Sequence, residues 1–278
     1  DFAPVFKLTD ASRQDLCATF TCEDTIAQLT LTISIKLSES GVLVIHESLR
    51  NDAKRDLQLL KLAPTVPLPS SSKELLTFYG RWTREFQQQR LEVNHGDFIQ
   101  EARVGRTSHD HFPGMMIGRK GFSEESGEVF GFHFGWSGNH TLRAGVKTDG
   151  KRFFQANELL LPGELKLGYR ETYTTPSLYC AHSDSGLNGI SDSFHPYVRR
   201  EIIHFRNSAP RPVHLNTWEG IYFDHKPDYI MQMASEAAKM GVERFIIDDG
   251  WFKGRNDDTT SLGDWYLDEK KYPDGLEP

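Results

Sequence analysis

The stretch VHLNTWEGIYFDHKPDYIMQMASEAAKMGVERFIIDDGW, residues 213–251, decides how the second part of the chain folds. Two short apolar runs, at 213–218 and 242–247, flank a segment with helical spacing, a pattern typical of strand, helix and strand. Pro227 suits the first turn of this helix, and Gly241 suits the residue after its last turn. The helix would turn one apolar face inward, made of Ile230, Met233, Ala234, Ala237 and Ala238. A crossover of this length joins parallel strands, so the stretch predicts a right-handed βαβ unit.

Polar and aromatic residues follow both predicted strands. The first strand runs into Asn-Thr-Trp-Glu at 216–219, and the second runs into Asp-Asp-Gly-Trp at 248–251. Because the carboxyl ends of parallel strands lie at one edge of a sheet, we expect these side chains to meet there. Indole rings stack on sugars and carboxylates bind hydroxyl groups, so the edge predicts a site for a neutral sugar. The alternatives are a simple turn at 248–250, tryptophans packed beneath loops and a Glu219 that is only a surface charge.

Residues 1–183 contain short extended runs separated by turns, which is typical of a β-sandwich. Apolar and polar residues alternate at 29–37, and an extended run at 42–49 follows a turn, so we expect an antiparallel hairpin. Aromatic residues alternate at 130–136, and 141–147 is expected to return beside them as a second hairpin. Another extended stretch covers 159–173.

The segment at 184–210 has a different pattern. Its apolar residues recur at helix-like intervals, and Pro196 interrupts them, so we expect a helical linker there. The sequence therefore predicts three parts, a β-sandwich over 1–183, a helical linker over 184–210 and an α/β segment over 211–278.

Composition and missing motifs exclude several classes of function. Lysine and arginine total 32 against 39 aspartates and glutamates, a net charge of −7, and this disfavours nucleic acid as a partner. No apolar stretch is long enough to span a membrane, and the phosphate-binding glycine loops and the serine-hydrolase elbow are absent. The His-Asp-His triplet at 109–111 is interpreted as a solvated loop, so we expect no metal site and no cofactor. Three cysteines, too few for a disulfide framework, favour a reducing compartment.

Several motifs together resemble one enzyme family. They are Leu-Asn-Thr-Trp-Glu at 215–219, Tyr-Phe-Asp at 222–224, Ile-Ile-Asp-Asp-Gly-Trp-Phe at 246–252, Arg-Asn-Asp-Asp at 255–258 and Leu-Gly-Asp-Trp at 262–265, with Gly-Arg-Trp at 80–82, Thr-Ser-His at 107–109, Gly-Glu-Val-Phe-Gly at 127–131 and Trp-Ser-Gly-Asn at 136–139 upstream. In this order they closely resemble the α-galactosidases of glycoside hydrolase family 36, over nearly the whole chain. The resemblance implies a multidomain fold, an antiparallel β-supersandwich followed by the first βαβ unit of a (β/α)₈ TIM barrel.

The resemblance also implies an activity and roles for individual residues. Such enzymes remove terminal α-D-galactosyl groups from melibiose- or raffinose-type oligosaccharides with retention of configuration. Trp218 would then line the galactose pocket, and Asp248 and Asp249 would bind sugar hydroxyl groups. Trp251 and Trp265 would support the pocket or its loops. A cytoplasmic location and a homo-oligomer, in many cases a tetramer, are further expectations from the family.

The two catalytic carboxyl groups of the family have no counterpart among these residues. Its nucleophile is the aspartate of a Lys-Trp-Asp motif and its acid/base aspartate lies later still, but no Lys-Trp-Asp occurs in the chain. A retaining glycosidase needs two opposed carboxyl groups, and adjacent residues such as Asp248 and Asp249 diverge along a strand. From Pro212 onward only 278 − 212 + 1 = 67 residues are present, against roughly 250 in a typical barrel. We therefore expect a fragment that supplies galactose-binding residues but is inactive alone.

Three other interpretations stay open at this point. The parent enzyme would be an α-N-acetylgalactosaminidase or a galactosyl transferase of related sequence. Alternatively, the chain would be a non-catalytic carbohydrate-binding or assembly module. A metal-dependent barrel hydrolase would instead use Asp248, Asp249 and histidines as ligands.

Overall fold

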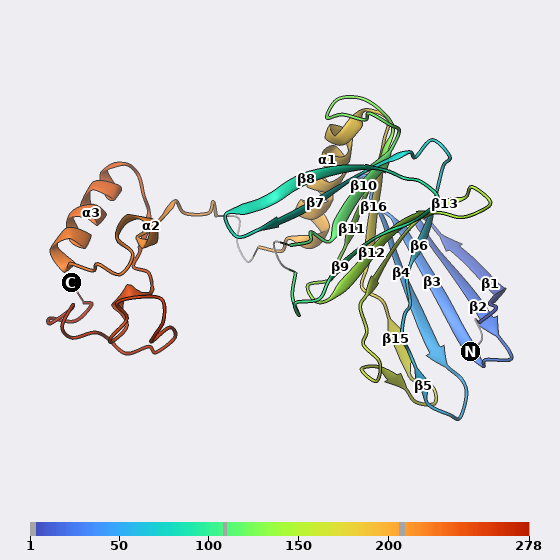
Figure 1. Cartoon of the computed structure of the whole chain (residues 1–278), viewed down its shortest axis with the longest axis horizontal. Helices are drawn as coiled ribbons and strands as arrows, with labels where there is room; N and C mark the ends of the chain where they lie inside the picture. The colour runs from blue at the N-terminus through green and yellow to red at the C-terminus, as the bar shows by residue number, and fades with distance from the viewer. Residues whose placement is uncertain (1–3, 108–109, 206–208, 278) are drawn as a thin grey trace. The chain divides into compact units, whose positions relative to one another are not determined.

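The computed structural model describes residues 4–107, 110–205 and 209–277 and divides into two compact units (Figure 1). The first unit covers Asp1–His204 and the second Phe205–Pro278. The described helices include none that is both long and apolar enough to cross a membrane.

A large antiparallel sheet forms one layer of the first unit. Its strands lie in the order β1 (Lys7–Gln14), β2 (Cys17–Asp24), β3 (Leu29–Leu37), β4 (Leu43–Asn51), β16 (Leu178–Ser183), β11 (Val129–Phe134), β10 (Gly114–Gly118), β7 (Glu74–Arg81) and β8 (Arg84–Glu92), and β15 (Thr172–Thr174) also pairs with β4. The hairpin expected at 29–37 and 42–49 is confirmed, because β3 and β4 pair antiparallel from Leu29↔Asn51 to Leu37↔Leu43.

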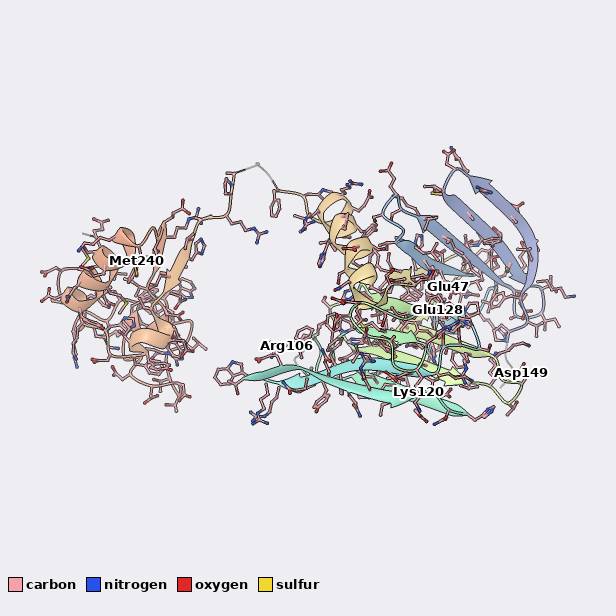
Figure 2. All side chains as sticks on the ribbon, turned by 90° about the horizontal axis from the view of Figure 1, so that it is seen from above. Glu47, Arg106, Lys120, Glu128, Asp149 and Met240 are labelled. Carbon is pink, nitrogen blue, oxygen red and sulfur yellow. The ribbon has the colours of Figure 1, made fainter. Side chains whose placement is uncertain are left out.

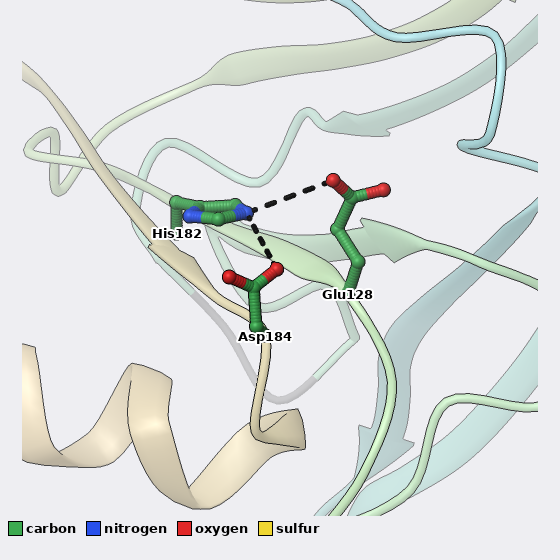
Figure 3. Close-up of side chains that lie close together, drawn as sticks. All are labelled: Glu128, His182 and Asp184. Carbon is green, nitrogen blue, oxygen red and sulfur yellow. Dashed lines mark ion pairs between the residues drawn. The ribbon is translucent and has the colours of Figure 1, made fainter.

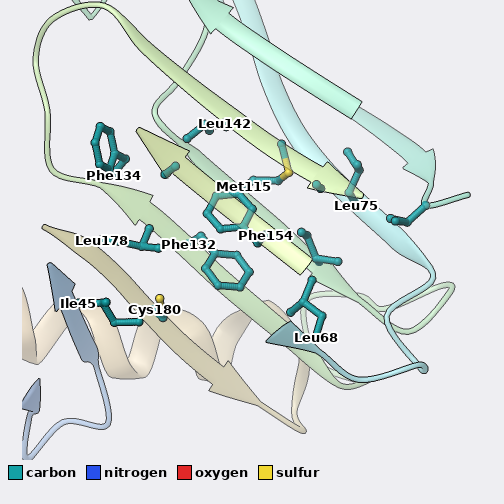
Figure 4. Packing of buried hydrophobic residues seen from close by; sticks show 14 of the residues in the cluster. Ile45, Leu68, Leu75, Met115, Phe132, Phe134, Leu142, Phe154, Leu178 and Cys180 are labelled. Atoms are coloured by element: carbon teal, nitrogen blue, oxygen red, sulfur yellow. The ribbon is translucent and has the colours of Figure 1, made fainter. Parts of the chain in front are cut away.

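A smaller antiparallel sheet forms the facing layer. Its order is β6 (Thr65–Leu68), β13 (Arg152–Glu158), β12 (His140–Val146) and β9 (Gly96–Ala102), and β5 (Leu57–Gln58) pairs separately with β14 (Lys166–Leu167). Buried side chains from both sheets form one hydrophobic core (Figure 4). The ring of Phe132 on the large sheet stacks on that of Phe154 on the small sheet, with centroids 4.1 Å apart. The packing is that of a β-sandwich.

The second hairpin expected from the sequence is wrong. β11 pairs with β10 and β16 in the large sheet, whereas β12 pairs with β9 and β13 in the small sheet. Phe132 and Leu142 both face the core, but from opposite layers. The residues between these strands therefore cross from one sheet to the other. Of the extended stretch expected at 159–173, only Lys166–Leu167 and the beginning of β15 are strand.

The helix expected as a linker belongs to the first unit. α1 (Gly186–Tyr197) contains Pro196 near its end and continues as a π-helical segment, Val198–Ile202. Ile190 of α1 packs with Val129 and Ala181 of the large sheet. Because α1 packs on the large sheet, it is part of the first unit. The boundary between the two units lies after His204, inside the segment 184–210 that was expected to be a linker.

The second unit contains the predicted strand, helix and strand. β17 (His214–Asn216) and β18 (Arg244–Ile246) pair in parallel, and α3 (Pro227–Lys239) lies between them in the sequence. Gly241 has φ +91° and ends α3 as expected, because its N–H donates to the carbonyl of Ala238 while that of Val242 donates to the carbonyl of Ala237. A short helix that was not expected, α2 (Trp218–Ile221), follows β17.

This second unit has a small core of its own. Ile221 and Ile230 are buried together with Tyr272, so Ile230 of the predicted apolar face is confirmed, whereas Ala238 is exposed. The fold class is confirmed by the two units together, since antiparallel β-layers precede a parallel strand, helix and strand.

Candidate functional site

Asn216 connects the ends of the two parallel strands. Its Nδ2 donates to Asp248 Oδ2 at 2.6 Å, and its Oδ1 accepts the backbone N–H of Trp218 at 2.7 Å. The backbone N–H of Asp248 also donates to Thr217 Oγ1, at 3.1 Å. The structure therefore brings Trp218 and Asp248 to the same edge, as the strand ends predict.

Asp249 has a different set of partners. It begins a 3₁₀ turn, Asp249–Trp251, and its Oδ2 accepts from Arg255 Nε at 3.1 Å and from Arg255 Nη2 at 2.8 Å. The Arg255 side chain is only 4% exposed and lies with its guanidinium carbon 5.2 Å from the centre of the Phe223 ring. Asp249 Oδ1 is buried and has no hydrogen-bond partner among the described residues. A ligand hydroxyl group is one donor that would satisfy this oxygen.

The aromatic residues form two groups. Trp218 is partly buried and meets the rings of Tyr222 and Phe223 edge-on, with centroids 5.3 and 5.0 Å away. Trp251 lies against Phe252 and 6.0 Å from the exposed ring of Trp265. Both groups follow the ends of the parallel strands in sequence. Within the described part of the chain, no ring contact joins Trp218 to Trp251.

The partly buried Lys271 holds the turn in place. The Lys271 ammonium donates to the carbonyls of Phe223, Gly250 and Arg255 at 3.1, 2.8 and 2.8 Å. Burial lowers the pKa of this amine, although Asp268 and Asp224 oppose the shift. One side chain thereby fixes three loop segments around Asp249.

His225 supports the same turn from another side. Its Nδ1 lies 2.6 Å from the Tyr272 hydroxyl and its Nε2 lies 3.0 Å from the Tyr222 carbonyl. Burial, followed by the charge of Lys271, lowers the pKa of His225. A Cβ at Gly250 would come within 2.3 Å of His225 Nε2, so the close approach of turn and ring requires glycine.

Sequence reasoning missed these supporting residues. Arg255 lies within one of the quoted motifs, and its spacing from Asp249 was the available signal. His225 and Lys271 have no such signal, because one histidine and one lysine in polar loops are ordinary surface residues.

Two groups of side chains have the residue types of a metal site. In the triplet at 109–111, His109 lies outside the described residues. In the first unit, His182 Nε2 lies 3.8 Å from Glu128 Oε1 and 3.5 Å from Asp184 Oδ1 (Figure 3). The Ser71 hydroxyl and then the Arg119 charge lower the pKa of Glu128, so protein groups already compensate this carboxylate. The side chain of Asp184 is 82% exposed.

Comparison with known families supplies the assignment. The model of the glycosyl hydrolase family 36 N-terminal domain matches residues 11–168, and the melibiase model matches residues 172–278. The chain belongs to glycoside hydrolase family 36. The resemblance drawn from the motifs is thereby confirmed. The melibiase match includes α1, the parallel strands and the turn at Asp249.

Relatives within family 36 agree over the whole chain. The α-galactosidase of Escherichia coli is 52% identical over 278 residues, which are 100% of this chain and 39% of the relative. The crystal structure of the α-galactosidase AgaA from Geobacillus stearothermophilus superposes with a TM-score of 0.88 at 27% identity, covering 100% of this chain and 42% of that one. A variant of AgaA in complex with raffinose superposes with a TM-score of 0.84 at 29% identity, covering 99% and 39%. The chain thus spans about two fifths of these proteins.

Proposed function

We propose that the protein to which this family 36 chain belongs is a retaining α-galactosidase that removes terminal α-D-galactosyl residues from melibiose- and raffinose-type oligosaccharides. The observation that carries the proposal is the edge formed by Trp218, Asn216 and Asp248, in a chain 52% identical to a known α-galactosidase. The raffinose complex of AgaA supports the substrate class.

The candidate site residues act in binding galactose. Trp218 offers an indole face to the apolar side of the sugar, and Asp248 and Asp249 accept hydrogen bonds from its hydroxyl groups. The unpartnered Oδ1 of Asp249 is the acceptor that gains most from a sugar hydroxyl. Trp251 and Trp265 lie further along the loop and support the wall of the pocket.

Neither aspartate is the nucleophile in this proposal. Asp248 is held by the Asn216 amide and by the backbone N–H of Asp249, while Asp249 is ion-paired with Arg255. The reaction instead needs two carboxyl groups about 5–5.5 Å apart on opposite sides of the sugar. We infer that both come from the later part of the catalytic domain, where the family carries Lys-Trp-Asp.

The stereochemistry of hydrolysis tests this proposal. The full-length protein is mixed with an aryl α-galactoside in an NMR tube, and we expect α-galactose to form before mutarotation. Binding of galactose without hydrolysis would indicate the carbohydrate-binding module instead. Faster cleavage of an α-N-acetylgalactosaminide than of the α-galactoside would indicate an α-N-acetylgalactosaminidase. Transfer of galactose to an acceptor sugar in preference to water would indicate a galactosyl transferase. Loss of activity on chelation would indicate a metal-dependent hydrolase.

A cytoplasmic location and a homo-oligomeric state are part of the proposal. Three unpaired cysteines support the location, and burial raises the pKa of the Cys180 thiol to about 12, so this thiol is unreactive. Fractionation of the source cells and light scattering of the purified protein test the two statements.

A further inference from the structure

The small sheet of the sandwich carries a cavity on its outer side. The cavity has a volume of about 420 Å³, within the roughly 300–1,000 Å³ of small-molecule sites. Successive residues of a strand face opposite sides of the sheet. In β12 the core residues are Leu142, Ala144 and Val146, so Thr141 and Arg143, which line the cavity, point away from the core.

The strand register places polar residues from three strands side by side on this outer face. Thr141 of β12 pairs with Glu101 of β9 and Asn157 of β13, and all three line the cavity. Four residues further along β12, Gly145 pairs with Asp97 of β9 and Phe153 of β13. A Cβ at Gly145 would come within 2.2 Å of Asp97 Oδ1, so the glycine leaves room for Asp97 to lie across β12.

Two buried atoms in the cavity wall lack hydrogen-bond partners among the residues that the structure describes, Asn157 Oδ1 and Arg143 Nε. Asn157 is 4% exposed, and its Nδ2 already donates to the Glu158 carbonyl at 2.8 Å. The terminal nitrogens of Arg143 bind Gln155 and Asp97. A buried polar atom without a partner destabilises the protein, so each atom favours a ligand that satisfies it.

The chemistry of these two atoms selects the ligand. Asn157 Oδ1 needs a donor, whereas Arg143 Nε–H needs an acceptor. An anion would satisfy only the arginine and a cation only the asparagine, but a hydroxyl group both donates and accepts. Arg143 is also ion-paired with Asp97, and Arg103 with Glu101. Lys61, the remaining charged residue of the lining, interacts with the same two carboxylates, and burial lowers the pKa of its amine. A neutral ligand with several hydroxyl groups fits best.

Apolar side chains complete the site. Leu60, Ile99 and Leu161 line the cavity and are 56%, 52% and 48% exposed. Such surfaces suit the C–H faces of a sugar ring beside its hydroxyl groups. We propose that this outer face is a second carbohydrate-binding site, separate in sequence and fold from the edge at Trp218, that takes a neutral oligosaccharide. The choice of a sugar among hydroxyl-bearing ligands rests on the proposed function.

Titration calorimetry with raffinose tests the second site in the full-length protein. The variant Asp249→Asn weakens binding at the edge near Trp218 roughly ten- to hundredfold, and we expect the outer-face site to be the tighter saturable site that remains. In this background Asn157→Ala, which removes the orphan acceptor, weakens the remaining binding about tenfold, the ratio for 1.4 kcal/mol. Arg143→Lys keeps the charge but removes Nε–H, and we expect a similar loss. Thr148→Ala, an exposed change in the turn after β12 and outside the cavity, leaves binding unchanged.

The outcomes separate this proposal from the proposed function. Raffinose binding that persists unchanged in both Asn157→Ala and Arg143→Lys overturns the second site, and so does the absence of any binding in the Asp249→Asn background. Either result leaves hydrolysis by the wild-type protein untouched. Conversely, a protein that binds raffinose at the outer face but hydrolyses no galactoside refutes the proposed function alone. Thermal unfolding of each variant verifies the fold, and Arg143→Lys decides the question where Asn157→Ala does not fold.

Discussion

At the scale of single residues, the two neighbouring aspartates that follow β18 have different hydrogen-bond partners. Asp248 accepts from the Asn216 amide at 2.6 Å, and Asp249 accepts from two nitrogens of the buried Arg255. The repulsion between adjacent carboxylates is thereby offset by separate donors, since charge-assisted hydrogen bonds are among the strongest in proteins. Both side chains are thereby held beyond the ends of the parallel strands.

Glu47 gives a prediction for the pH dependence of stability. It lies on β4 between the core residues Ile45 and Leu49 (Figure 2), and burial raises its pKa to about 7. Between its unfolded pKa of 4.5 and about 7 the folded state binds more protons, so the free energy of unfolding falls as pH rises. Glu47→Gln should remove this slope and stabilise the protein at pH 8 by roughly 2–3 kcal/mol. Urea unfolding at pH 5 and pH 8 measures the difference.

The control for Glu47 is Glu23→Gln, which changes an exposed carboxylate on β2 of the same sheet. We expect it to leave the dependence of stability on pH as in the wild type. A Glu47→Gln protein that is no more stable than wild type at pH 8 would contradict the account.

At the scale of elements, glycine decides how closely the 3₁₀ turn approaches the loop beneath it. Gly250→Ala places a methyl group against the ring of His225 and should destabilise the second unit by about 1–3 kcal/mol. The matched control is Gly220→Ala within α2, where the nearest atom is Met233 Cε at 3.6 Å, so we expect a neutral or slightly stabilising effect. Unfolding curves followed by tryptophan fluorescence compare the two. Equal stability of both variants would show that the contact with His225 is not tight.

The helices and strands were predictable where the residue pattern indicates an element and that element pairs or packs with its neighbour in the sequence. The alternation at 29–37 and the turn after it specify β3 and β4, and Pro227 and Gly241 specify the ends of α3. The pairing of β11 was not predictable, because alternation shows which face is buried but does not show which sheet a strand joins. The apolar spacing of α1 likewise indicates a buried face without naming the sheet that covers it.

The candidate site shows the same limit. Trp218, Asp248 and Asp249 were predictable from their place after parallel strands. The spacing of Arg255 from Asp249 was a signal, but it does not by itself show that the two residues pair. His225 and Lys271 come from loops whose paths depend on tertiary packing, so their contacts with the turn could not be read from spacing.

At the scale of the whole molecule, the proposed function places sugar binding in the part of the catalytic domain that this chain contains. It places cleavage of the glycosidic bond in the later part of that domain. Residues 1–278 expressed alone should show no release of nitrophenol from an aryl α-galactoside, whereas the full-length protein should release it. The reason is that the proposed function uses Asp248 and Asp249 as hydrogen-bond acceptors on one side of the sugar, so the two reacting carboxyl groups must come from elsewhere. Any turnover above background by the purified segment, abolished by Asp249→Asn, would refute this division.

Calorimetric titration of the full-length protein with galactose tests the central claim most directly, namely that Trp218, Asp248 and Asp249 jointly bind the sugar. A hydrogen bond to a charged group contributes about 1.5–3 kcal/mol, so Asp248→Asn and Asp249→Asn should each weaken binding by roughly ten- to hundredfold. Trp218→Ala should weaken it at least tenfold through lost stacking, while Asp228→Asn, an exposed change in the first turn of α3, should have no effect. Galactose affinity that stays within twofold of wild type in the three site variants would contradict the account.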